Sequence, residues 1–210
     1  MFAVESIVCS ALFYALYRLL LEGRVAHSVA RGYLLFAVVL SVVIPLLELP
    51  ILPAEVVATE VVTLPAEFVD MAVEVAAADA VVERTFDWIL ALEILYFAVV
   101  AIFAVRFAVI AAKICKLRRD SELRSYRGVT VAANRSVAEP FSFCRTIFVS
   151  AVENREQVLL HEHSHIAHMH TFERLFFEFA RSVMWFNPFV HLMARAAAQV
   201  EEWQADGDVI

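Results

Sequence analysis

The stretch His161-Glu162-His163-Ser164-His165 follows the pattern HExxH and organises the second half of the chain. On a helix, His161 and His165 lie four residues apart on one face, where both imidazoles can reach a single zinc ion. Glu162 lies one step around the helix, within reach of a water molecule that attacks a peptide bond. The pattern therefore predicts a zinc-binding helix with Glu162 as the catalytic general base.

A catalytic zinc needs three protein ligands and one open position, so a third ligand must come from outside this motif. The longer pattern HExxHxxGxxH is excluded, because His168 stands at its glycine position and Thr171 at its final histidine. The remaining carboxylate candidates are Glu173, Glu178, Glu201 and Glu202. Glu202 and Asp206 are four residues apart and share a helical face. We therefore predict Glu202 as the third zinc ligand and Asp206 as the carboxylate that orients a ligand histidine.

Other residues of this region have simpler interpretations. His191 is a further candidate, as a group that would stabilise the oxyanion. The remaining histidines of the region are predicted to face solvent or to support the ligands: His163, His168 and His170. The acidic cluster that includes Glu202 and Asp206 can also be read as nothing more than the polar end of a helix. The HExxH motif favours the metal site over that interpretation.

The composition predicts a mainly α-helical integral membrane protein. Of the 210 residues, 61% are hydrophobic, whereas a soluble domain has about 45–50%. Much of this excess lies in three apolar stretches, at about 2–21, 33–47 and 88–114, which we predict as transmembrane helices in contact with the lipid bilayer. The net charge of −7 argues against direct nucleic-acid binding, which requires a basic surface.

Charged residues predict how these helices are oriented. Basic residues surround the first connection and follow the third helix: Arg18, Arg24, Arg31, Lys113, Lys116, Arg118 and Arg119. The loop 48–87 is acidic, and its segment 68–82 is predicted to form an amphipathic helix on the membrane surface. By the positive-inside rule, the N-terminus and this loop lie outside, and everything after Lys113 is cytoplasmic.

The segment 117–210 is predicted to be a cytoplasm-facing, zincin-like helical domain that follows a transmembrane region of residues 1–116. Its first part contains two short apolar runs, 128–131 and 146–149, separated by turn-forming residues. We predict that they form a short β-hairpin, or part of a small sheet, just before the metal motif. Its edge is a candidate for pairing with an extended substrate, and the alternative is a cap packed on the catalytic helix.

The segment 171–195 is strongly apolar and contains the pair Asn187-Pro188. A fourth crossing of the bilayer would carry Glu202 to the opposite side from His161. Proline disfavours helical geometry in the residue before it, so the pair predicts a break. We therefore predict an apolar helical hairpin, either dipping into the membrane or packed against the other helices, which returns Glu202 to the zinc.

The ordered set of these features resembles the BlaR/MecR-type membrane metallopeptidases, the antirepressor regulatory proteases of bacteria. The resemblance covers essentially the whole chain and includes the runs Trp185-Phe186-Asn187-Pro188 and Glu202-Trp203-Gln204-Ala205-Asp206. It implies a multi-pass protein of the bacterial cytoplasmic (inner) membrane with a gluzincin-type zinc site facing the cytoplasm. It also implies that an external signal activates cleavage of the protease itself or of a cytoplasmic transcriptional repressor.

Members of this family usually continue beyond the point that corresponds to Ile210, so we expect the chain to be truncated or a minimal member. A rival interpretation is a non-enzymatic membrane sensor or scaffold whose zinc site is structural or degenerate. Four protein ligands would favour that rival, whereas an open position would favour the enzyme. A third interpretation is a transport protein that uses Glu93 and Arg106 within the third apolar stretch.

Overall fold

The computed structural model describes residues 2–47, 87–152 and 155–209. The described residues fall into two units, one with residues 2–47 and those from 96 onward, and the other with residues 87–95. Within the second unit the structure describes only the start of a helix, which Asp87 caps by accepting hydrogen bonds from two backbone N–H groups. The predicted loop 48–87 lies outside the described residues apart from Asp87, and its predicted helix over 68–82 lies wholly outside them.

The described part of the chain is mostly helical, with three helices long and apolar enough to cross a membrane. These candidate spans are α1 (Phe2–Leu16) with the π-helical turn η1 (Tyr17–Leu21), α2 (His27–Leu46) and α4 (Trp88–Arg119). The prediction of three such helices and a small sheet is confirmed, while the zincin-like character of the domain stays a prediction.

Two helix boundaries differ from those predicted. The second helix begins at His27 rather than near residue 33, because Arg31 is buried in an ion pair with Glu173 and its charge does not end the helix. The third helix continues past residue 114 to Arg119. Its last turns carry Lys116 and two arginines, whose charges interact favourably with the carbonyl end of a helix.

The sheet has four strands in the order β1-β2-β4-β3. Their bounds are β1 (Glu122–Tyr126), β2 (Val129–Ala133), β3 (Phe141–Phe143) and β4 (Thr146–Val149). The predicted hairpin between the two apolar runs is wrong, because β2 and β4 pair in parallel. Each instead forms an antiparallel hairpin with its own neighbour, β1 or β3.

Burial and turn geometry explain this topology. The strands β2 and β4 are the two central strands and are almost entirely buried, which is typical of parallel pairs covered on both faces. Arg127 and Gly128 both have positive φ, as a two-residue turn of type I′ between β1 and β2 requires. The tight turn therefore joins β2 to the strand before it, and β4 comes back alongside β2 after β3.

Helices cover the sheet on both faces. Leu159 and Ile166, from helix α5 (Glu156–Ala167), pack against one apolar cluster of the sheet. Ile114 and Leu117, from the last turns of α4, pack against a second cluster that contains Phe148. Alternate residues of a strand face opposite sides, so neighbouring residues of β4 join different clusters. This packing holds α5, which carries the HExxH motif, against the sheet.

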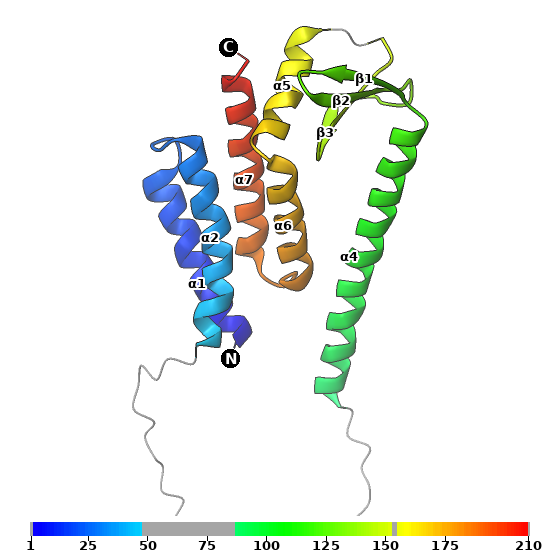
Figure 1. Ribbon diagram of the computed structural model, residues 1–210. Helices are drawn as coiled ribbons and strands as arrows, with labels where there is room; N and C mark the ends of the chain where they lie inside the picture. Colours follow the sequence, from blue (N-terminus) through cyan, green and yellow to red (C-terminus); the bar gives the residue numbers. More distant parts are fainter. Residues whose placement is uncertain (1, 48–86, 153–154, 210) are drawn as a thin grey trace, which may run out of the picture. The chain divides into compact units, whose positions relative to one another are not determined.

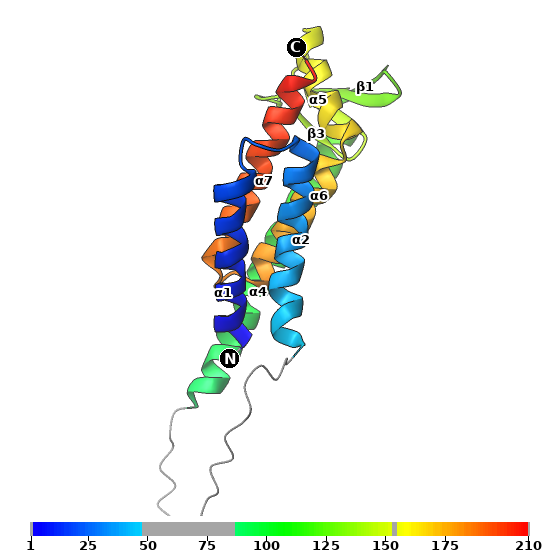
Figure 2. The ribbon, with the colours of Figure 1, turned by 90° about the vertical axis from the view of Figure 1, so that its left-hand side faces the viewer.

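The last two helices form the predicted hairpin, with its break at Asn187-Pro188. Helices α6 (His170–Val183) and α7 (Pro188–Gly207) pack on each other and on α2, and α7 also packs on α1 (Figures 1 and 2). Neither α6 nor α7 is among the candidate membrane spans. Asn187 is fully buried, where it caps α7 and donates a hydrogen bond to Ser10 Oγ at 2.9 Å. The turn of the hairpin is thereby attached to α1.

Candidate metal centre

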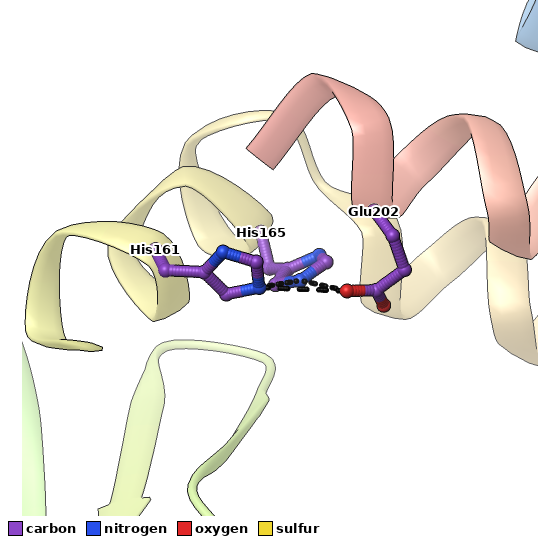
Figure 3. A group of neighbouring side chains, drawn as sticks. All are labelled: His161, His165 and Glu202. Atoms are coloured by element: carbon purple, nitrogen blue, oxygen red, sulfur yellow. Dashed lines mark hydrogen bonds and ion pairs between the residues drawn. The ribbon is translucent and has the colours of Figure 1, made fainter. Parts of the chain in front are cut away.

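Two helices bring the three predicted ligands together. His161 and His165 project from one face of α5, and Glu202 projects toward them from α7 (Figure 3). Glu202 Oε2 lies 3.4 Å from His161 Nε2 and 3.6 Å from His165 Nε2, and the two imidazole nitrogens are 3.2 Å apart. Among the described residues, this is the one group of three or more histidine, cysteine or carboxylate side chains with metal-site spacing.

These separations match the requirements of a tetrahedral zinc ion. With zinc–ligand bonds of about 2.0–2.2 Å, neighbouring donors at the corners of a tetrahedron are about 3.3–3.6 Å apart. The three observed separations lie within about 0.2 Å of that range. Two neutral imidazoles and one carboxylate also form a ligand set that zinc accepts and that leaves a fourth position open. The residues present therefore fit zinc.

The imidazole of His165 contacts a second buried histidine on the side away from Glu202. Its Nδ1 lies 2.6 Å from Nδ1 of His170, which is almost completely buried. Burial lowers the pKa of His165 to about 4 and that of His170 to about 3. Both rings are therefore neutral near pH 7, which is the form of histidine that binds a metal ion. The contact with His170 directs His165 Nε2 toward the site.

Asp206 lies beside the other histidine. Its Oδ1 lies 3.1 Å from His161 Nδ1, while His161 Nε2 faces Glu202. A carboxylate on the far nitrogen of a ligand histidine fixes the ring orientation and raises its basicity. Glu202 and Asp206 are one helical turn apart on α7. This spacing places the Glu202 carboxylate beside His161 Nε2, at the candidate metal position, and the Asp206 carboxylate beside His161 Nδ1.

We expect Asp206→Asn to weaken zinc binding by about 10- to 100-fold, the usual cost of losing such a partner. Isothermal titration of metal-free, detergent-purified protein with zinc measures this change. Asp120→Asn serves as the control, because Asp120 is exposed at the end of α4, away from the ligands. Zinc affinity equal to that of the unsubstituted protein would show that Asp206 does not support His161.

Arg174, on α6, was not predicted to belong to the site. It donates hydrogen bonds to Glu202 Oε1 and Glu201 Oε2, both at 2.6 Å. Burial alone raises the pKa of Glu202, but the hydrogen bond from Arg174 and the charge of nearby groups hold it below its ordinary value. Glu202 is therefore ionised, with one oxygen held by Arg174 and the other directed at the two histidines. No local sequence signal links residues that lie on different helices.

Glu162 has the environment expected of a general base. Its side chain is buried, with 7% of the residue exposed, and burial raises its pKa above the ordinary value of a glutamate. Hydrogen bonding with Ser142, on β3, partly offsets this rise. Glu162 lines an open cavity of about 540 Å³ together with Pro140, Gln157, Val158, His161, Asp206 and Val209. Both Glu162 and His161 are therefore accessible from this cavity.

Other candidates from the sequence lie elsewhere. His191 does not join the site, because it is eleven residues before Glu202 on α7, about 16 Å along the axis. Its ring accepts a hydrogen bond from Arg181 and lies 3.1 Å from the Trp185 carbonyl oxygen.

The three carboxylates that were alternative candidates for the third zinc ligand each form an ion pair with an arginine. Glu173 pairs with Arg31, Glu178 with Arg181 and Glu201 with Arg174.

Comparison with known proteins adds no further assignment. No protein-family model matches the chain, and no curated protein matches it. What can be said about function therefore rests on the geometry of the site and on the resemblance of its motifs.

Proposed function

We propose that the protein is a membrane-embedded zinc metallopeptidase. The observation that carries this proposal is the set of three donor separations, 3.2, 3.4 and 3.6 Å, between His161, His165 and Glu202. The buried general-base candidate Glu162 lies on the same helix and lines an open cavity. The resemblance to BlaR/MecR-type proteases supports a regulatory role, in which the substrate is the protein itself or a cytoplasmic transcriptional repressor.

In this mechanism, Glu162 moves the proton. Its carboxylate accepts a proton from the attacking water and passes it to the leaving amine of the cleaved peptide. The raised pKa of Glu162 suits a group that must both take and return a proton near neutral pH. A zinc ion held by His161, His165 and Glu202 would supply Lewis acidity toward the carbonyl and the water.

The strand β3 supplies a binding edge for the peptide. It is an edge strand of the sheet, contacts α5, and contributes Ser142 beside Glu162. Pro140, immediately before this strand, lines the same cavity. An extended peptide that pairs with a strand edge gains main-chain hydrogen bonds, which gives affinity without a strict sequence requirement. The strand acts both as a cap on α5 and as a substrate guide.

The membrane helices would place this site at the cytoplasmic surface. The residues of α7 that carry the site lie beside the start of α2, where Arg31 contacts Gln204, whereas the turn of the α6–α7 hairpin contacts Ser10 in α1. The arginines of the first connection lie close to the N-terminus of α2. The positive-inside rule assigns this end of the helices to the cytoplasm. We propose that the hairpin enters the membrane from the cytoplasmic side and that its outer end carries no part of the site.

Metal loading and peptide hydrolysis test this function together. We expect purified protein to bind one zinc per chain and to cleave fluorescently labelled casein, and we expect 1,10-phenanthroline to stop cleavage until zinc is restored. The rival is a non-enzymatic sensor or scaffold with a structural site. Zinc binding without hydrolysis, together with a fourth protein ligand in an X-ray absorption spectrum, would favour that rival.

A further inference from the structure

Arg31 is a buried charge near the start of the membrane helix α2. The residue is only 7% exposed, and its guanidinium donates hydrogen bonds to two other helices and to the turn between α5 and α6. On α6 it forms a fork with both carboxylate oxygens of Glu173. It also donates to the carbonyl oxygen of His168, just after α5, at 2.9 Å, and to Gln204 Oε1 on α7. One side chain of α2 thus binds α6, α7 and the turn that joins α5 to α6.

A chain of hydrogen bonds continues from Arg31 into the HExxH motif. With its oxygen held by Arg31, Gln204 presents its amide nitrogen to His168 Nδ1 at 3.0 Å. His168 Nε2 then lies 2.8 Å from Asp208 Oδ2, which also accepts a hydrogen bond from Ser164 Oγ at 2.5 Å. Ser164 directly precedes His165. The chain therefore runs from α2 through α7 to the middle of the motif.

This network spans the two helices whose spacing defines the metal site. Gln204 is two residues after Glu202 on α7, and Ser164 lies between the two histidines on α5. A small rotation or slide of α7 against α5 would change the distances from Glu202 to the imidazoles. The network opposes such a movement because each of its bonds joins groups on different elements. Arginine suits this role, since its planar fork fixes several acceptors at once.

We propose that Arg31 is a positioning residue of the zinc site: from α2 it sets the placement of Glu202 relative to His161 and His165. This inference rests on the proposed function. Arg31 contacts none of the three donor atoms and acts through Gln204 and His168. A change in the position of α2 would reach the metal ligands through the same bonds, so the second membrane helix is coupled to the site.

Cobalt(II) titration of the metal-free 210-residue chain tests this role, because bound cobalt reports affinity and ligand geometry in its visible spectrum. The informative variant is Arg31→Met/Glu173→Gln, which removes both charges and leaves no unpaired buried ion. We expect its thermal midpoint to stay close to that of the unsubstituted protein, while its cobalt affinity falls about 10- to 100-fold and its spectrum changes. Gln204→Leu should lower cobalt affinity while leaving the Arg31–Glu173 pair intact.

Two further variants separate positioning from simple stabilisation. Arg31→Lys keeps the charge but cannot form the fork, so we expect it not to restore cobalt affinity. Arg24→Met is the matched control, since Arg24 is an exposed arginine just before α2 and should leave affinity unchanged. Unsubstituted affinity and spectrum in both Arg31→Met/Glu173→Gln and Gln204→Leu would overturn the positioning role while the metal site stands. Failure of the unsubstituted protein to bind cobalt or zinc would overturn the metal site itself.

Discussion

Glu162→Gln is expected to lower peptide hydrolysis by about 10²- to 10⁴-fold while leaving zinc bound, because a general base typically contributes a rate factor of that size. The amide has the shape of the carboxylate and can still interact with Ser142, but it cannot accept the proton of the attacking water. Cleavage of fluorescently labelled casein measures the rate, and metal analysis of the same sample measures bound zinc. Both measurements are needed, since loss of zinc would also stop hydrolysis.

Glu156→Gln is the matched control for this variant. Glu156 is an exposed glutamate in the first turn of the same helix and lies 3.8 Å from Arg127. It is outside the cavity, so its substitution should leave both cleavage and zinc content unchanged. Hydrolysis by Glu162→Gln at the unsubstituted rate would remove Glu162 from the mechanism and would require another base at the cavity.

His165→Ala is expected to weaken zinc binding by more than about 100-fold. Loss of a direct ligand removes a bond to the metal, so the effect should exceed the 10- to 100-fold cost of losing a supporting partner. His165 is also the most buried of the three candidate ligands, with 5% of the residue exposed, so water cannot easily take its place. Isothermal titration of metal-free protein with zinc gives the affinity directly.

The control for His165→Ala comes from the same helix. His163 stacks edge-on against Tyr126 and is not one of the three clustered ligands, so His163→Ala should bind zinc normally. Glu202→Gln extends the test to α7, because it keeps a partner for Arg174 but loses the anionic donor. Glu178→Gln is the control for Glu202→Gln, because Glu178 is an exposed glutamate on α6 outside the ligand cluster. Equal affinity in His165→Ala and the unsubstituted protein would refute the proposed ligand set.

Local patterns explain the parts of the fold that could be predicted. Candidate membrane helices follow from long apolar runs, because a segment that crosses a bilayer must be apolar along its whole length. The break at Asn187-Pro188 follows from the steric effect of proline on the preceding residue. Boundaries were less accurate: α2 begins before Arg31, whose charge is neutralised by Glu173 on a helix far along the chain.

The strand pairing shows a different kind of failure. Two short apolar runs predict two strands, but the same runs are compatible with parallel or antiparallel neighbours. The structure has β2 and β4 side by side in parallel, with a hairpin partner on the outer side of each. The choice depends on the positive φ values at Arg127 and Gly128 and on how α4 and α5 cover the sheet. Neither factor can be read from the apolar runs themselves.

The sequence by itself determined the pairs of residues that one helical turn brings together. His161 with His165, and Glu202 with Asp206, follow from the four-residue spacing, since residues at that spacing share a helical face whatever surrounds them. Only the tertiary structure decided which groups meet across helices: His170 behind His165, Arg174 on Glu202, and the Arg31 fork. Such contacts depend on how separate helices pack, because residues far apart in the chain become neighbours only when their apolar faces are buried against each other.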